Sequence, residues 1–349
     1  ATPVGFTAAV AAEPWPEACT IDRMPAVAAD TKVVTVPAEL VEAALAEGQL
    51  VIYSAITETA TMDTIAAEFQ KAYPGVATTW TIAGGGSQRS ARFLAEAEAG
   101  TPGADVITEF SKAFFKEAFG KGYLVPIDMA IAGFTDVWPE DLVWSNEGGI
   151  TGVFTYSPFG FAYNTNQVPA ELAPTSWEDL ARPEFKGHIQ IKDVNASANT
   201  ANHFQFLRET LGDERFRAFA SNLTPTPLHT DAQIMAQELA AGGTWVMPQA
   251  QPNVIDAIAA TGAPIKSVVP GTVGGSQYSV GIATNSAHPN AAKLFATWTY
   301  SPQGQWVIAC AMRSGSQVFP EYGPENFVAY SATSEEELSQ LNQMMGITP

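Results

Sequence analysis

The sequence predicts an α/β protein built from two lobes. Short apolar runs rich in β-branched residues alternate with helix-like segments in the first half of the chain, and the alternation resumes after residue 188. Between these regions, residues 152–164 form an extended aromatic segment. The chain has 349 residues, 46% of them hydrophobic, which suffices for two lobes of ordinary domain size. No apolar run approaches the length that spans a membrane.

The first predicted lobe follows a loose arm. Residues 1 to about 45 form this arm, because Pro14, Pro16, Pro25 and Pro37 interrupt every apolar stretch. The core begins near Leu50. Apolar runs that end at residues 55, 87 and 108 read as strands, and residues 63–73, 89–100 and 112–120 read as helices. This β-α-β-α-β-α order indicates a parallel sheet covered on both faces.

The second half is predicted to start with an extended segment and then to repeat the α/β pattern. Pro158 and Gly160 make a continuous helix over residues 152–164 improbable. The predicted strands are 189–191 and 245–247, and the predicted helices are 200–211 and 231–241. Residues 268–270 and 278–283 lead the chain out of this region. Helices at 289–299 and 302–311 and an acidic tail helix near 334–345 complete the chain.

Small polar residues follow the first three predicted strands. The strands end at Ser54 and Ala55, at the Gly85-Gly86-Ser87 turn, and at Thr108. In an open α/β sheet, ligands bind outside the carboxyl ends of such strands and face the N-termini of the next helices. These residues therefore predict a small-molecule site. A phosphate loop is not predicted, because no lysine follows the glycines in a Walker pattern.

The charge balance restricts the possible partners. The formal net charge is −19, from 36 acidic and 17 basic residues. Nucleic-acid binding is not expected, because phosphate contacts need clustered Lys and Arg. A basic patch for anionic lipid is not expected either. The simplest interpretation of the charge is solubility.

The two cysteines, Cys19 and Cys310, leave two interpretations open. They form a disulfide between the N-terminal arm and the C-terminal region, or they are unrelated free thiols. Their spacing excludes a local zinc knuckle or a thioredoxin motif. The chain begins without Met or a basic leader, as expected for a mature exported protein or a trimmed chain, and it has no lipid-anchor cysteine near its start.

Eight short motifs resemble one family of transport proteins. They are VIYSA at 51–55, AGGGS at 83–87, RFLAE at 92–96, PGADV at 102–106, GYLVP at 122–126, GFAYNT at 160–165, PTSWEDL at 174–180 and PEFKG at 183–187. Together they resemble the iron(III)-type branch of extracellular solute-binding proteins, which also includes aminoalkylphosphonate-type binders. These are type II periplasmic binding proteins that feed ABC importers. The resemblance covers roughly residues 48–320.

The resemblance implies a fold, a partner and a location. The family fold is two α/β lobes joined by two crossing strands, here near 152–164 and 269–283, with the ligand in the interlobe cleft. The implied domains are an arm at 1–47, lobe 1 at 48–153 plus 272–300, and lobe 2 at 154–271 plus 301–349. We expect a monomer without cofactor that works with an ABC permease in the periplasm or outside the cell. We expect no enzymatic activity.

The sequence departs from the iron-binding members of that family. These hold iron through a pair of adjacent tyrosines, and the matching stretch here, residues 243–253, contains none. Ser54, Ala55 and Ile56 stand where a histidine often helps. Because ferric iron prefers hard anionic oxygen ligands, iron is not expected as the ligand. Iron held with a synergistic anion through other residues is kept as an alternative.

The predicted ligand is therefore a small organic anion or zwitterion that is captured by hinge closure. Asn195 and Ser197 lie between a strand and a helix, where the related organic-anion binders hold the acidic head of the ligand; the alternative is an ordinary N-cap. Gln249 and Gln251 are predicted cleft residues or, alternatively, a polar surface loop. Tyr156 is predicted to line the ligand or, alternatively, to pack at the lobe junction.

Charged and nucleophilic residues allow further hypotheses. Arg89 either counters an anionic ligand or faces solvent, and Glu58 and Glu109 are a conceivable acid–base pair, with Glu109 otherwise suited to an ammonium group. The four scattered histidines do not have metal-ligand spacing. The rival function is an enzyme acting in the cleft, with a cysteine as its nucleophile.

Overall fold

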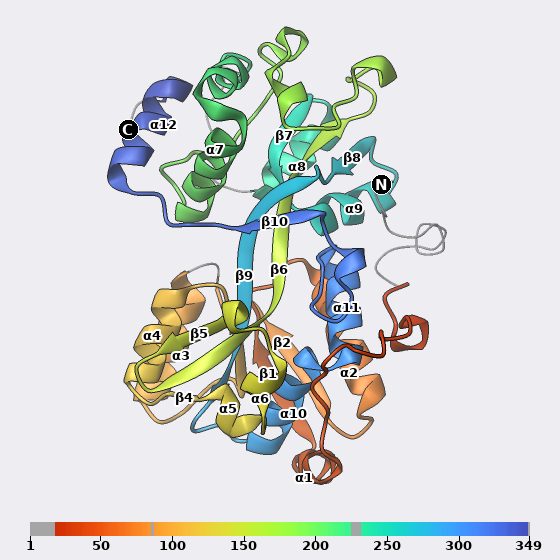
Figure 1. The fold of residues 1–349 in the computed structure, drawn as a ribbon, viewed down its shortest axis with the longest axis vertical. Coiled ribbons are helices and arrows are strands. Elements are labelled where there is room, and N and C mark those ends of the chain that lie inside the picture. The colour runs from red at the N-terminus through yellow and green to blue at the C-terminus, as the bar shows by residue number, and fades with distance from the viewer. Residues whose placement is uncertain (1–17, 85–86, 225–231, 348–349) are drawn as a thin grey trace. The chain divides into compact units, whose positions relative to one another are not determined.

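Two long strands, β6 (Gly149–Asn164) and β9 (Thr272–Ala283), each run from one folded unit into another (Figure 1). The computed structural model describes residues 18–84, 87–224 and 232–347. Lobe 1 comprises residues 18–156 and Gln277–Gly323, and lobe 2 comprises Ser157–Ser276 and the residues from Pro324 onward. The chain thus changes lobe inside β6 and inside β9, in the two regions that the family resemblance implies. It changes lobe a third time after Gly323, whereas the predicted domains place this change after residue 300.

The sheet of lobe 1 has parallel strands at its centre, as the β-α alternation predicts. β1 pairs in parallel with both β2 and β3, and β9 runs antiparallel to β3. The path of neighbouring strands is β2-β1-β3-β9-β6-β5, with β4 also paired to β9. The strands are β1 (Gln49–Tyr53), β2 (Ala77–Thr81), β3 (Val106–Glu109), β4 (Leu124–Val125) and β5 (Val143–Asn146).

The helices of lobe 1 start where local capping residues stand. Glu58 caps α2, because its carboxylate accepts hydrogen bonds from the N–H groups of Ala60 and Thr61 at 3.0 and 2.6 Å. Ser111 caps α4 in the same way by accepting from the Phe114 N–H at 3.2 Å. The helices are η1 (Ile21–Arg23), α1 (Ala38–Glu47), α2 (Thr59–Ala72), α3 (Ser87–Glu98), α4 (Lys112–Gly120), α5 (Ile127–Ala130), α6 (Phe134–Val137), η2 (Glu140–Leu142), α10 (Pro289–Tyr300), α11 (Pro302–Met312) and η6 (Pro320–Tyr322).

Lobe 2 surrounds an aromatic core that includes Phe161, Trp177 and Phe204. β7 and β8 pair antiparallel with β6, and β10 pairs in parallel with β9. The predicted strand at 189–191 is present only as isolated bridges of Ile189. The elements are η3 (Ala170–Leu172), η4 (Glu178–Ala181), η5 (Pro183–Phe185), α7 (Ala198–Ala220), α8 (Ala232–Ala241), β7 (Val246–Ala250), α9 (Pro252–Ala260), β8 (Ile265–Val268), β10 (Asn326–Ala329) and α12 (Glu335–Met345).

The structure corrects one predicted domain boundary. Residues 301–323, which the sequence analysis assigns to lobe 2, belong to lobe 1. The reason is packing: α11 is buried along nearly its whole length and lies against α2 and α10. Ser301 ends α10 and at once caps α11, so the two helices stay in one unit. The end of the arm also belongs to lobe 1, because α1 packs against α10.

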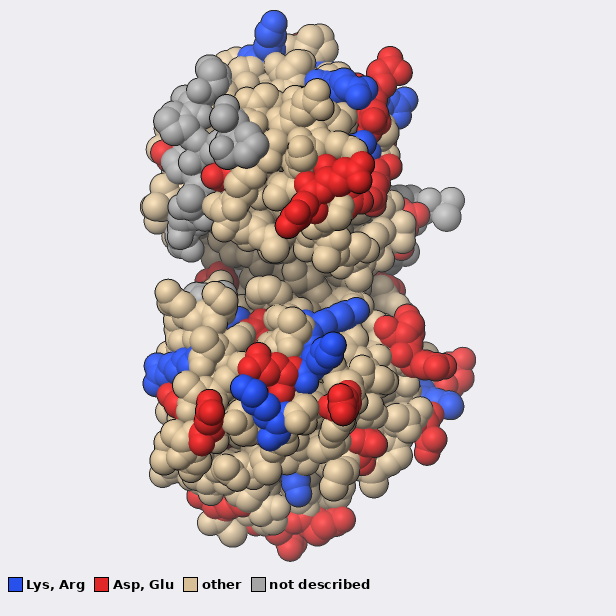
Figure 2. All heavy atoms as spheres, turned by 90° about the vertical axis from the view of Figure 1, so that its left-hand side faces the viewer, with Lys and Arg blue, Asp and Glu red and all other residues tan. Residues whose placement is uncertain are grey.

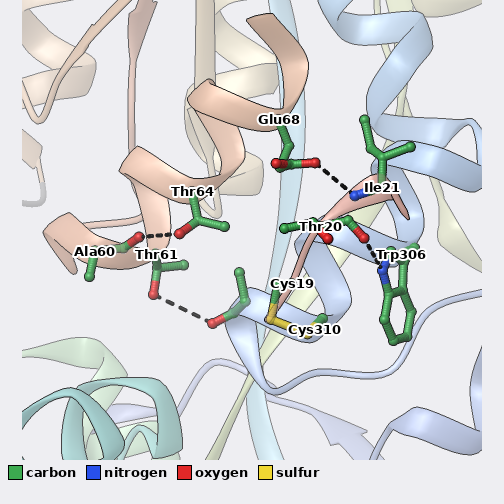
Figure 3. The surroundings of a disulfide bond; sticks show 10 residues. Cys19, Thr20, Ile21, Ala60, Thr61, Thr64, Glu68, Trp306 and Cys310 are labelled. Carbon is green, nitrogen blue, oxygen red and sulfur yellow. Dashed lines mark hydrogen bonds between the residues drawn. A yellow bond between two sulfur atoms is a disulfide. The ribbon is translucent and has the colours of Figure 1, made fainter. Parts of the chain in front are cut away.

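A disulfide between Cys19 and Cys310 attaches the arm to α11 (Figure 3). The structure thus has the first of the two alternatives, with both cysteines buried. Two hydrogen bonds flank the disulfide: the Trp306 indole donates to the Thr20 carbonyl at 2.9 Å, and the Ile21 N–H donates to the Glu68 carboxylate at 2.7 Å. The arm is therefore part of the lobe 1 structure from residue 18 onward.

None of the helices in the described part of the chain combines the length and the apolar character that a membrane crossing needs.

We predict that loss of the disulfide destabilises lobe 1. The bond closes a loop with a sequence separation of 291 residues, so it strongly restricts the unfolded chain. Replacing both cysteines with serine should lower the free energy of unfolding by about 2–5 kcal/mol. Urea unfolding followed by tryptophan fluorescence, with and without a thiol reductant, measures this change.

The double variant is its own control, because a reductant should leave its unfolding curve unchanged. Equal midpoints for the oxidised and reduced natural chain would contradict the prediction.

Candidate functional site

In lobe 1, the residues at the ends of β1 and β3 hold one another in place. The Ala55 N–H donates to the Thr108 hydroxyl oxygen at 3.0 Å. The Ser54 hydroxyl donates to the Ile56 carbonyl at 3.0 Å and is buried, as is Thr108. These predicted site residues therefore lie together, with their polar atoms bonded within the chain. These bonds fix the shape of the strand ends.

Arg89 forms a buried ion pair with Glu109, and this corrects both hypotheses made for these residues. The side chains are only 1% and 2% exposed, and the guanidinium donates to the Glu109 carboxylate at 2.8 and 3.2 Å. A third bond of 3.2 Å joins the Arg89 guanidinium to the Ser54 carbonyl. Arg89 therefore neither faces solvent nor counters a ligand. It connects α3 to the ends of β1 and β3.

Glu109 is fully occupied by the chain. Beyond Arg89, its carboxylate accepts from the Ser90 hydroxyl at 2.9 Å and from the Phe110 N–H at 2.8 Å. Glu58 is the N-cap of α2, and the Thr61 hydroxyl also donates to it at 2.6 Å. The hypothesis of an acid–base pair is therefore wrong, because each carboxylate holds a separate piece of local structure.

A cavity of about 410 Å³ lies between α3 and α4, beside this ion pair. Hydroxyl groups of Ser87, Ser90 and Ser111 and the side chains of Glu109 and Glu117 supply its polar lining, and its apolar lining is Ala91, Leu94, Phe110, Ala113 and Phe114. Ser87 was predicted from the sequence. Ser90 and Ser111 were missed, although Ser111 follows the third strand within two residues. Gly85 and Gly86 lie outside the described residues.

The face of lobe 1 that carries α3 and α4 has charges of both signs. Figure 2 shows its Lys and Arg side chains among Asp and Glu side chains. Arg92 pairs with Glu96 and Lys121 pairs with Glu117, each at 2.8 Å and one helical turn apart. On the face shown, the basic residues thus form no continuous patch of the kind that binds phosphate backbones.

In lobe 2, the N-terminus of α7 is not capped by a side chain. Ser197 occupies the N-cap position with extended backbone angles, φ −155° and ψ 127°, but its hydroxyl accepts no hydrogen bond from the helix. The N–H groups of Ala198 and Asn199, at the first two helical positions, have no acceptor within the helix. The alternative of an ordinary Ser197 cap is therefore not present, and the helix start is open to an acceptor.

Gln249 and Ser276 contact Asn199 in the first turn of α7, and Gln251, two residues after Gln249, contacts Ser157; we call these five residues the α7 polar cluster. Gln249 donates to the Asn199 carbonyl at 3.4 Å, and Ser276 donates to the Asn199 side-chain oxygen at 3.1 Å. Gln251 donates to the Ser157 hydroxyl at 2.8 Å. Ser157 and Ser276 are the lobe 2 residues at which β6 enters and β9 leaves. The structure thus brings Gln249 and Gln251 to one place, close in sequence to Ser197.

Two other predicted site residues are held by the chain itself. The Asn195 amide exchanges hydrogen bonds of 3.2 and 2.9 Å with Asn342 on α12. Tyr156 packs its hydroxyl against Gly315 and Gly323, where a β-carbon would clash with it at 2.1 Å and 2.9 Å. Burial raises the pKa of Tyr156 to about 12, although a backbone hydrogen bond from Gly315 acts in the opposite direction. Both residues have clear packing roles.

His203 is a buried neutral base behind the α7 polar cluster. Its Nε2 lies 2.8 Å from the Pro248 carbonyl, which only accepts, so Nε2 carries the proton and Nδ1 accepts from the Tyr330 hydroxyl at 2.6 Å. Burial lowers the pKa of His203 to about 3. Burial also raises the pKa of Tyr330 well above its ordinary value. This pair fixes β7 just before Gln249.

Neither cysteine is available as a nucleophile, because both belong to the disulfide. Within the described residues, no group of three or more His, Cys, Asp or Glu side chains is placed to hold a metal ion.

Comparison with known families identifies the family of this chain. Residues 101–337 match the family described as bacterial extracellular solute-binding protein. The chain belongs to this family.

This chain shares the two-lobed type II periplasmic-binding-protein fold with solved structures. The substrate-binding protein of an ABC transporter from Agrobacterium tumefaciens is 16% identical, with a TM-score of 0.64 over 86% of this chain and 96% of that one. The periplasmic binding protein AfuA from Actinobacillus pleuropneumoniae, solved with fructose-6-phosphate, is 22% identical, with a TM-score of 0.53 over 86% and 97%. At these identities the likeness concerns the fold alone.

A relative in sequence is an uncharacterised protein of Haemophilus influenzae. It is 27% identical over 154 residues, which are 42% of this chain. The match spans 44% of that relative's length, less than half of it.

We predict that Arg89 and Glu109 stabilise lobe 1 only as a pair. Removing one partner leaves a buried charge uncompensated, so Arg89→Met or Glu109→Gln alone should lower the free energy of unfolding by about 3–5 kcal/mol. The double variant should lose less than the sum of the two single losses. A double-mutant cycle in urea measures the coupling.

Arg92→Met, which breaks an exposed ion pair on the same helix, is the matched control and should cost about 1 kcal/mol or less. Additive losses from the two single variants at Arg89 and Glu109 would refute the coupling.

We also predict that His203 makes lobe 2 sensitive to acid. Because its folded-state pKa is about 3 and the ordinary pKa of histidine is 6.5, the unfolded chain binds the extra proton between these values. The stabilisation is complete above pH 6.5 and is lost as the pH falls towards 3, by about 3 kcal/mol between pH 7 and pH 4.

The measurement compares the free energy of unfolding against pH for the natural chain and for His203→Gln, which keeps a donor and an acceptor but does not titrate. The variant should have the flatter profile, whereas His188→Gln should keep the steep one. Parallel profiles for the natural chain and His203→Gln would rule the prediction out.

Proposed function

We propose that this protein captures a small organic anion or zwitterion for uptake by an ABC permease, in the periplasm or outside the cell. Family membership supports solute capture. One observation carries the ligand class: the start of α7 has neither a capping side chain nor an intrahelical acceptor for its first N–H groups. An anionic group of the ligand accepts these hydrogen bonds.

The helix dipole makes this position favourable for negative charge. The first part of α7 runs from Ala198 to the break at Gly212, whose φ is +74°. A helix of this length carries about half a positive elementary charge at its N-terminus. In a chain with a net charge of −19, such a local positive end gives an anion a defined place to bind.

The cavity of lobe 1 supports an organic ligand rather than a bare oxyanion. Its volume of about 410 Å³ is in the range of small-molecule pockets, and Leu94, Phe110 and Phe114 give it an apolar lining. Its serine hydroxyls offer a few polar contacts. A carbon skeleton with a polar end fits this combination better than an inorganic ion does.

Capture by hinge closure remains part of this proposal, as does action by the monomer. A ligand that interacts differently with the open and closed states shifts the population towards the closed one. Small-angle scattering with and without ligand tests this step, and an unchanged radius of gyration at saturation would count against it.

Native mass spectrometry of the purified protein, before and after denaturation, tests the function itself. We expect release of a stoichiometric organic anion or zwitterion, or, from an empty protein, a thermal shift with members of an organic-anion library. An iron-sized adduct, or no response to the library, would overturn the proposal.

We predict that Ala198→Pro weakens binding of that ligand without unfolding the protein. Ala198 is the first helical residue, where proline is well tolerated, and the extended Ser197 suits a following proline. The change removes one N–H donor from the anion site. Affinity measured by calorimetry should fall by about tenfold, as expected for loss of one charge-assisted hydrogen bond.

Ala38→Pro makes the same change at the first residue of α1 and is the matched control. It should leave affinity unchanged. Equal affinities for both variants and the natural chain would exclude the α7 N-terminus as the anion site.

A further inference from the structure

Gln249 buries an amide oxygen that has no hydrogen-bond partner. The residue is only 2% exposed, and its Oε1 atom accepts no hydrogen bond from the described residues. The orientation of the amide is assigned from its neighbour, because Nε2 faces the Asn199 carbonyl and turning the group would oppose two acceptor oxygens. An unsatisfied buried acceptor is unfavourable, so its presence needs an explanation.

Gln305 and Gln249 differ in the hydrogen bonds that their amide nitrogens make. Its Oε1 is also unpartnered, but its Nε2 donates to the Phe154 and Thr299 carbonyls at 2.8 and 2.6 Å. These two short bonds account for the position of Gln305 in the core of lobe 1. The Gln249 amide has a single long bond of 3.4 Å, which does not account for its burial in lobe 2.

A second unpartnered oxygen lies in the first turn of α7, next to Asn199. Thr200 is fully buried, and its hydroxyl has no hydrogen-bond partner among the described residues. Thr200 follows Asn199 directly, and the Asn199 carbonyl accepts the Gln249 amide. The helix start that offers N–H donors to an anion thus carries one buried oxygen able to accept, and Gln249 of β7, which donates to it, carries another.

We propose that the ligand bears a hydrogen-bond donor, an ammonium or hydroxyl group, which Gln249 Oε1 accepts while the anionic group of the ligand binds the α7 N-terminus. This inference rests on the proposed function and narrows its ligand class. The ligand is then a zwitterion or a hydroxylated organic anion. Unsubstituted alkyl phosphates and carboxylates bind poorly, because they leave the Gln249 oxygen buried and unpaired.

The site selects among ligands through the hydrogen-bond donor that Gln249 Oε1 does not find within the protein. A pocket built to hydrogen-bond a polar group rejects analogues without that group more strongly than an apolar pocket rejects an extra methylene. Gln249 carries no charge, so it accepts from either an ammonium or a hydroxyl group. The identity of the donor is therefore left to the experiment.

Calorimetric titration with two matched series tests the inference. The probes are propyl, hydroxypropyl and aminopropyl phosphate, and butanoate, hydroxybutanoate and aminobutanoate, each with the added group on the terminal carbon. A donor-bearing member should bind about tenfold or more tightly than its unsubstituted parent. Whether the hydroxyl or the ammonium member binds best identifies the donor.

Gln249→Met keeps the length of the side chain and removes the acceptor. The preference for the donor-bearing member should fall to about one in this variant, and its ligand-free unfolding curve should stay where it was or shift to higher urea. Gln305→Met is the matched control: it should lower stability and leave the preference intact.

Three results would overturn the inference while leaving the proposed function standing: parents that bind as tightly as donor-bearing members, a preference that survives in Gln249→Met, or strong destabilisation of that variant without ligand. If no member of either series binds, the proposed function fails together with the inference.

Discussion

The buried Arg89–Glu109 ion pair is the interaction on which the edge of lobe 1 at the carboxyl ends of β1 and β3 depends. One guanidinium bonds to the carboxylate at the end of β3 and to the Ser54 carbonyl at the end of β1, and it comes from the third residue of α3. Burying two charges is costly unless both find partners, and here the Ser90 hydroxyl and the Phe110 N–H complete the carboxylate shell. Three segments distant in sequence are thereby held in one geometry, and the cavity between α3 and α4 lies against it.

Local signals predicted α2, α3, α4, α10 and α11 of lobe 1 well, because their causes are local, but α1 (Ala38–Glu47) was wrongly predicted as part of a loose arm. The residues of α4 agree with the prediction, since Ser111 caps its start and apolar residues recur along one face. The role of Arg89 could not be predicted in this way. Glu109 is 20 residues away in sequence, and only the parallel pairing of β1 with β3 brings the ends of these strands to α3. Sequence reasoning selected the correct strand ends but not the contacts that hold them.

The predicted change from lobe 1 to lobe 2 after residue 300 was wrong for a related reason. Helix α11 is apolar on all sides, a pattern that indicates burial but does not name the partner helices. Its packing against α2 and α10 is set by the tertiary structure, and the disulfide between Cys310 and Cys19 stabilises it. In lobe 2, by contrast, the sequence indicated Gln249 and Gln251 through their position in the family pattern, and the structure brings both to the α7 start. The unpartnered oxygen of Gln249 had no signal in the sequence.

Taken one at a time, the ion pair of lobe 1 and the α7 polar cluster of lobe 2 leave no buried charge uncompensated among the groups that compose them. In lobe 1 the charges of Arg89 and Glu109 neutralise each other, and in lobe 2 the polar cluster consists of amides, hydroxyls and backbone N–H groups. Neutral donors and acceptors are less costly to desolvate than an unpaired charge. The strength of their hydrogen bonds depends on the angle between donor and acceptor. A site of this kind gains its selectivity from the placement of each partner atom rather than from net charge. For a chain that is itself strongly negative, fixed dipoles provide a way to bind an anion without a buried, uncompensated cation.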